Sequence, residues 1–166
     1  MSYFSRRMTA ELDGPFAVFL IGMRINKLWR VDHWLPVTRA MPRMMRELQA
    51  NPELGLLGYE GWFGRTTLML QYWRSVEHLM DYAKARDREH LPAWREFNRR
   101  ARKASSVGIW HETYVIEPGA HESVYFNMPR FGLARAGEHV DAVGHRRTAR
   151  GRLRGQPAAR ELQRAA

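Results

Sequence analysis

The chain has 166 residues, the size of one ordinary domain, and its 45% hydrophobic and 11% aromatic content is enough to build a core. Cysteine is absent, which excludes disulfides, thiolate metal sites and cysteine nucleophiles. The formal net charge is +10, but residues 134–166 hold eight arginines against three acidic residues. Half of the excess positive charge therefore lies at the end of the chain, and we expect no specific nucleic-acid groove.

The first fifteen residues mix charged side chains with Gly14 and Pro15 and show no periodicity. This composition predicts a flexible lead-in over residues 1–15. The segment lacks the basic start, apolar run and small-residue cleavage site of a secretory signal. The longest apolar run, residues 16–23, is far too short to span a bilayer. We therefore expect a cytoplasmic protein with no membrane span.

Residues 16–26 are rich in β-forming side chains and predict a strand that is buried on both faces for most of its length. Residues 27–34 are expected to form a loop. Apolar side chains then recur at every third or fourth position over residues 35–51, which is the pattern of an amphipathic helix. Pro42 lies inside this segment, where proline removes a hydrogen bond, so the regular part of the helix could begin there.

Two β-rich runs, residues 56–63 and 66–73, flank the short connection Gly64-Arg65. Such a spacing is typical of two antiparallel neighbours joined in a hairpin. Ser75 follows the second run and is well placed to cap a second helix that starts directly after it.

Pro92 suits the first turn of a third helical segment, because proline lacks only a backbone N–H that has no partner there. The apolar side of this segment is expected to carry Trp94, Phe97 and Ala101. Residues 107–116 predict a last strand, in which alternate side chains point to opposite faces. The two sets are Val107, Ile109, His111, Thr113 and Val115 on one face and Gly108, Trp110, Glu112, Tyr114 and Ile116 on the other.

The predicted order is strand, helix, strand, strand, broken helix, strand, which is the split βαβ plan of the ferredoxin-like fold. The expected fold class is therefore α+β, with a four-stranded antiparallel sheet and helices on one face. Aromatic side chains on the other face need a cover, so we expect a homodimer of the dimeric α/β-barrel type. The domain is expected to span residues 16–133, including an aromatic extension over residues 118–133 that packs on the domain or on its partner. Residues 134–166 predict a basic disordered tail.

Five blocks of the chain are distinctive: IGMRINKLWRVDHWLPVTRAMPRMMRELQANPELGLLG, WFGRTTLMLQYWRS, HLPAWREFN, VGIWHETY and VYFNMPRFGL. Together they resemble a family of small bacterial and fungal proteins that is similar to the fumagillin-pathway monooxygenase and is grouped with the dimeric α/β-barrel superfamily. The resemblance covers residues 16–133 and implies a ferredoxin-like dimer. It leaves the activity open, because that superfamily includes cofactor-independent monooxygenases, haem-degrading enzymes, aldoxime dehydratases, chlorite dismutases and plain binding modules.

Polar groups that point into the layer between helices and sheet are the first candidates for a site, and they are Asn26, Trp73, Tyr82 and His90. The set is similar to that of the haem-degrading members, in which a strand-end asparagine, a helix aromatic and a following histidine line the haem. In this chain the aromatic would be Tyr82 instead of tryptophan. His90 would be a haem ligand in that interpretation, and a helix cap or a solvent-facing residue in the alternative one.

His111 on the last strand is the second candidate, either as an axial haem ligand or as a general base. The alternative is a core or interface histidine that is hydrogen-bonded to a neighbour. Cofactor-independent oxygenation needs an apolar enclosure and a few donors that stabilise an enolate or phenolate. On that basis we expect Asn26, Tyr82 and His111 to be catalytic. The residues expected to bind substrate are Arg24, Trp62, Tyr72, Trp73 and Trp110.

Three functions remain open from the sequence. The first is a monooxygenase-type enzyme that oxidises an apolar or aromatic small molecule between helices and sheet. The second is a haem protein, so the cofactor is either none or haem. The third is a non-catalytic dimeric module whose basic tail contacts acidic partners. No phosphate loop, dinucleotide fingerprint, serine triad or zinc motif is present, and we expect no metal site.

Overall fold

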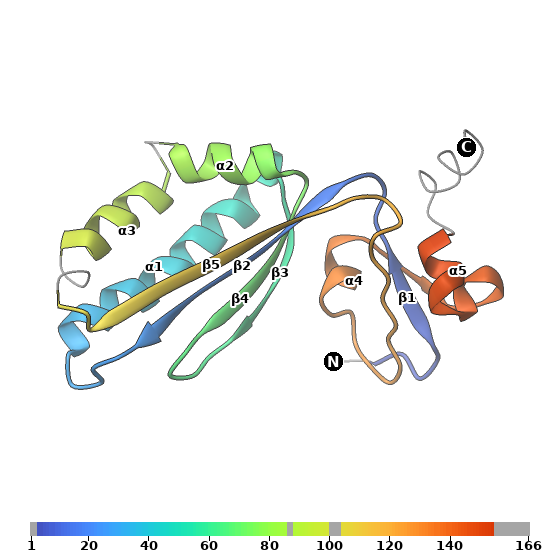
Figure 1. Cartoon of the computed structure of the whole chain (residues 1–166), viewed down its shortest axis with the longest axis horizontal. Coiled ribbons are helices and arrows are strands. Elements are labelled where there is room, and N and C mark those ends of the chain that lie inside the picture. The colour runs from blue at the N-terminus through green and yellow to red at the C-terminus, as the bar shows by residue number, and fades with distance from the viewer. Residues whose placement is uncertain (1–2, 86–87, 100–103, 155–166) are drawn as a thin grey trace.

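The computed structural model describes residues 3–85, 88–99 and 104–154. Its main part is a two-layer α+β structure with one four-stranded antiparallel sheet in the order β3-β4-β2-β5 (Figure 1). This arrangement is the ferredoxin-like fold expected from the sequence. Within the described residues the sheet is open and does not close into a barrel. The strands are β2 (Phe16–Ile25), β3 (Leu56–Trp62), β4 (Leu68–Trp73) and β5 (Val107–Ile116).

Three helices lie on one face of this sheet (Figure 1). They are α1 (Val31–Ala50), α2 (Val76–Lys84) and α3 (His90–Phe97), and the short 3-10 helix η1 (Pro52–Leu54) joins α1 to β3. The side chains buried between the two layers form the main core: Ala17, Ala40, Met44, Met45, Leu48, Trp73, Leu79 and Tyr82.

Helix α1 is longer than the sequence predicts. It begins at Val31, inside the expected loop of residues 27–34, and continues without a break through Pro36 and Pro42. Each proline removes one backbone hydrogen bond, but the helix buries a stripe of apolar side chains in the core. This burial outweighs the two missing bonds, because fully burying one large apolar side chain stabilises by about 1.5–3 kcal/mol.

The hairpin, the second helix and the last strand agree with the prediction. Ser75 is the N-cap of α2, and its Oγ accepts a hydrogen bond from the backbone N–H of His78 at 3.4 Å. Strand β5 has the expected bounds. Helix α3 presents Phe97 to the sheet as expected, whereas Ala101 lies outside the described residues.

Both ends of the described chain meet in a second, smaller unit, which we call the terminal lobe (residues 3–12 and 117–154). Strand β1 (Met8–Glu11) pairs antiparallel with β6 (Glu138–Asp141). The lobe also contains α4 (Leu133–Ala136), η3 (Gly144–Arg147) and α5 (Ala149–Arg154). Residues 8–11 and 134–154 therefore have regular structure where we expected a flexible lead-in and a disordered tail; residues 155–166 lie outside the described part.

Paired arginines explain why this basic segment folds. Arg146 donates to Glu11 on β1, with one N–O distance of 2.8 Å, and so ties η3 to the start of the chain. Arg152 is buried and donates to Glu122 at 2.8 Å. The local density of arginine predicts disorder in this segment. Carboxylates from distant parts of the chain neutralise two of these arginines and so allow the segment to fold.

The second face of the sheet is covered at one end by the terminal lobe (Figure 1). Phe16 and Tyr72 of the sheet pack there against Leu133 and Tyr125. The aromatic extension of residues 118–133 therefore packs on its own domain. Further along the same face Tyr114 of β5 is 48% exposed.

Candidate active-site pocket

A cavity of about 110 Å³ lies in the helix–sheet layer between α1, α3 and strands β2 and β4. Its walls are apolar. Helix α1 supplies Met41 and Met44, and α3 supplies Trp94 and Phe97. Trp62 and Phe63, at the turn between β3 and β4, line the cavity and are both exposed to solvent. The turn therefore forms the outer rim of the cavity.

His90 is the one titratable side chain among the described residues that line this cavity. It stands at the start of α3, and its Nδ1 lies 3.0 Å from the carbonyl oxygen of Ala83 in the last turn of α2. A carbonyl oxygen can only accept a hydrogen bond, so the neutral ring carries its proton on Nδ1 and keeps the lone pair on Nε2. His90 can therefore accept a proton from a bound molecule or coordinate a metal ion.

Glu47 of α1 fixes the segment in front of His90. Its Oε2 accepts hydrogen bonds from the Tyr82 hydroxyl at 2.8 Å and from the backbone N–H of Glu89 at 3.1 Å. Arg88 adds an ion pair at 3.7 Å. Burial, together with the hydrogen bond to Glu47, raises the pKa of Tyr82 well above its usual range, so its hydroxyl stays a donor. The network anchors the backbone that carries His90.

Three of the four residues expected around the pocket come together in the structure. The ring centroids of Trp73 and Tyr82 are 5.9 Å apart, and those of Tyr82 and His90 are 6.3 Å apart. Of these three residues, His90 alone lines the cavity. Trp73 is 1% exposed and donates from Nε1 to Gln71 at 2.9 Å, so it and Tyr82 belong to the core behind the cavity wall.

Three other predicted residues lie outside the cavity lining. Asn26 donates to the Ser105 carbonyl oxygen at 3.2 Å at the end of β2. The side chain of Arg24 is exposed and donates to Thr66. His111 is exposed on the edge strand β5, and its ring centroid lies 5.7 Å from that of Phe19. None of these three side chains lines the cavity, because they sit at the end or the edge of the sheet. Their expected catalytic and substrate-binding roles stay predictions.

Tyr72 and Trp110 lie on the other face of the sheet. Tyr72 packs under the terminal lobe, where burial raises its pKa to about 12. Trp110 is paired with Gly22 in the strand register, and a Cβ added at Gly22 would lie 2.6 Å from its indole Nε1. Of the five residues expected to bind substrate, Trp62 alone lines the cavity.

Met41, Met44 and Phe63 were not singled out by position as site residues. Met41 already belongs to the apolar stripe of α1 in the sequence, but that stripe reads equally well as core. No local sequence pattern marks Phe63 as a site residue, because its place at the rim of the cavity depends on the tertiary structure.

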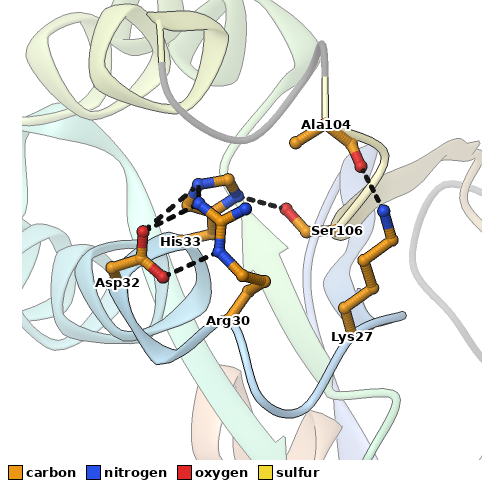
Figure 2. Close-up of polar contacts among 6 residues, drawn as sticks. All are labelled: Lys27, Arg30, Asp32, His33, Ala104 and Ser106. Atoms are coloured by element: carbon orange, nitrogen blue, oxygen red, sulfur yellow. Dashed lines mark hydrogen bonds and ion pairs between the residues drawn. The ribbon is translucent and has the colours of Figure 1, made fainter.

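The start of α1 is tied to the segment before β5 by a polar cluster (Figure 2). His33 is buried, and its Nδ1 lies 2.6 Å from the hydroxyl of Ser106. Asp32 lies 3.3 Å from Nε2 of the same ring and accepts two hydrogen bonds from Arg30. Ser106 is fully buried, so the cluster holds two segments together and does not expose a nucleophile.

Comparison with known proteins gives a curated relative and several solved structures. The chain is 29% identical over 131 residues to "Monooxygenase af470" from Aspergillus fumigatus, and the match covers 74% of the chain but 46% of that protein. The chain thus spans about half the length of this relative. A conserved protein of unknown function from Bacteroides thetaiotaomicron is 11% identical, with a TM-score of 0.43, over 63% of this chain and 100% of that one. A candidate antibiotic biosynthesis monooxygenase from Caulobacter crescentus is 10% identical, with a TM-score of 0.43, over 63% and 90%.

The family comparison covers the whole ferredoxin-like domain. Residues 16–133 match the family described as "Monooxygenase af470-like". This range contains the whole four-stranded sheet, the three helices that cover it and every residue that lines the cavity. The chain belongs to the monooxygenase af470-like family.

Proposed function

We propose that this protein is a monooxygenase-type enzyme that oxidises a small apolar or aromatic molecule bound between α1, α3 and the sheet. The observation that carries the proposal is an apolar cavity in which His90 is the single titratable side chain among the described lining residues and retains a lone pair on Nε2. Membership of a family named for a monooxygenase supports it. The chain spans about half the length of its curated relative. The activity is therefore proposed for this chain and is not taken over from the whole relative.

In this proposal His90 accepts a proton from an activated C–H or phenolic O–H group of the substrate. The apolar walls keep water away from the anion, which passes electrons to dioxygen and forms a peroxide on carbon. Loss of water from the peroxide turns a methylene group into a carbonyl group. One oxygen atom stays on the product and the other leaves as water, so the reaction is balanced without an external reductant.

The test is oxygen consumption by the purified protein with electron-rich phenols and conjugated polyenes as probes. His90→Gln is expected to lower the rate about 100-fold or more, since this is the usual contribution of a general base. Asn26→Ala and His111→Ala test the catalytic roles expected from the sequence. An active native protein with an unaffected His90→Gln variant would contradict the assignment of the base.

Haem binding is the second candidate function, because an imidazole with a free Nε2 lone pair in an apolar cavity is also a suitable axial ligand. The cavity of about 110 Å³ is smaller than the roughly 300–1,000 Å³ of most ligand sites, so haem would require α3 to move away from α1. A haemin titration decides: a Soret shift that is lost in His90→Ala supports haem, and no shift in the native protein ends this candidate.

We also propose a homodimer formed through the part of the second sheet face that the terminal lobe leaves open. Exposed Tyr114 on β5 marks this part. Sedimentation equilibrium of the native protein and of Tyr114→Glu tests the dimer, because a buried carboxylate at the contact would dissociate it. A monomeric native protein would contradict the proposal.

A further inference from the structure

Two exposed segments meet at one end of the sheet, at the lower left of Figure 1: the connection from β2 to α1 and the turn from β3 to β4. The backbone N–H of Ile25 donates to the carbonyl oxygen of Arg65 at 2.9 Å. The Arg24 guanidinium donates to the Thr66 hydroxyl at 2.8 Å. These bonds fix the two segments side by side, and we call them the loop end (residues 24–31 and 62–66).

Large apolar side chains are exposed on both segments of the loop end. Phe63 is 82% exposed on the turn, and Trp29 and Leu28 are 76% and 56% exposed on the connection. Single exposed apolar residues are common on protein surfaces, but large ones gathered on adjoining segments indicate a contact surface.

The loop end is also basic. Lys27 donates to the carbonyl oxygen of Ala104 (Figure 2), and Arg65 donates to that of Ile25. Together with Arg24 they bond to neutral acceptors, and within the described residues no ion pair to a carboxylate compensates these three charges. Arg30 is the exception, because it is paired with Asp32.

We propose that the loop end binds the surface of an anionic membrane. Tryptophan and phenylalanine favour the boundary between headgroups and acyl chains, and lysine and arginine beside them favour anionic headgroups. An acidic protein partner would need apolar pockets that match these side chains in position, whereas a bilayer accepts them in any arrangement. Among the described residues no helix is long and apolar enough to cross a bilayer, so the contact would be peripheral.

The position of the cavity links the proposed membrane contact to substrate entry. Trp62 and Phe63 belong both to the loop end and to the lining of the cavity. A docked molecule would therefore present the rim of its cavity to the bilayer, from which an apolar substrate could enter without crossing water. This consequence rests on the proposed function, whereas the membrane contact itself does not.

Flotation of the native chain with phosphatidylcholine vesicles, with and without phosphatidylserine, tests the contact. We expect binding to the anionic vesicles that falls as salt is added. The double variant Trp29→Ser/Phe63→Ser should bind at least about tenfold more weakly, because it removes two apolar side chains from the contact. Arg24→Gln and Arg65→Gln should each weaken binding about fivefold.

Phe126→Ser is the matched control, because Phe126 is 62% exposed but lies in the terminal lobe. It should bind as the native chain does, and circular dichroism should show that all variants fold. No binding to anionic vesicles, or an equal loss in Phe126→Ser, would overturn the proposal. If the native chain self-associates but does not bind vesicles, and the double variant abolishes this self-association, the surface contacts a second copy of the chain instead. Vesicle binding without any oxygen consumption would refute the proposed function alone.

Discussion

The two faces of the sheet are closed by different means. On the first face three helices bury two apolar clusters, and the packing leaves a small cavity beside His90. On the second face the terminal lobe covers one end, and ion pairs such as Arg146 with Glu11 hold the segments of the lobe together. The ion pair of Arg135 with Glu60 links the lobe to β3 of the sheet. The first face therefore depends mainly on apolar packing, whereas the second combines apolar packing with charged partners that lie far apart in the chain.

The largest effect is expected from the first face. Trp73→Ala should lower the free energy of unfolding by about 3–5 kcal/mol, because Trp73 is 1% exposed and its removal leaves a cavity under α1 and α2. Urea denaturation followed by circular dichroism measures this loss. Trp62→Ala is the control, since Trp62 is 43% exposed. Equal losses in the two variants would refute the distinction between core and rim.

A smaller loss of stability is expected at Gly22, where β2 lies close to the start of β4. A Cβ at Gly22 would meet the backbone carbonyl oxygen of Thr67, which cannot rotate away as a side chain can. Gly22→Ala should therefore cost about 1–3 kcal/mol in thermal or urea unfolding. At Gly108 the nearest atom would lie at 3.8 Å, so Gly108→Ala should be tolerated. If both variants were equally stable, the contact between β2 and the turn would be wrong.

The terminal lobe should respond to the loss of one charge. Arg152→Ala leaves Glu122 without its buried partner and should cost about 1.5 kcal/mol. The loss should appear as faster hydrogen exchange in β1 and β6 and not in β2. Arg150→Ala, at an exposed position, is the control. Uniformly faster exchange over the whole chain would show that the two faces unfold together.

Acid should loosen the same lobe, with the smallest effect of the four. Burial lowers the pKa of His121 and of His139, so the folded protein keeps both rings neutral. As the pH falls below about 6.5, the unfolded chain binds protons first, and the free energy of unfolding decreases. Limited proteolysis above and below this pH should show earlier cleavage in the lobe at low pH. His139→Phe should reduce the change, because it removes one of the two titrating groups.

Local patterns predict the first face better than the second. The bounds of β5 and the cap at Ser75 follow from strand and helix signals that involve only nearby residues. The start of α1 does not follow from such signals, because Pro36 and Pro42 favour a helix that begins later in the chain, whereas tertiary packing stabilises one that begins at Val31. The pairing of β1 with β6 joins residues about 130 positions apart, which no local pattern encodes.

The candidate site was predicted as a layer but not residue by residue. Alternation along a strand sorts side chains into two sets, but it does not tell which set faces the helices. In the structure Phe97 packs on Val107 and Ile109, so the set that contains Trp110 faces away from the cavity. His111 belongs to the set of Val107 and Ile109 but is exposed on the edge strand β5, and alternation does not predict this exposure.

The pairing of β1 with β6 also sets an order of events during synthesis. The ferredoxin-like domain is complete once residue 116 has been made, but β1 finds its partner only when residues 138–141 leave the ribosome. Until then Phe16 and Tyr72 have no cover from Leu133. A nascent chain stalled between these two points would therefore display an adhesive aromatic surface, and this is the stage at which chaperones would be needed most.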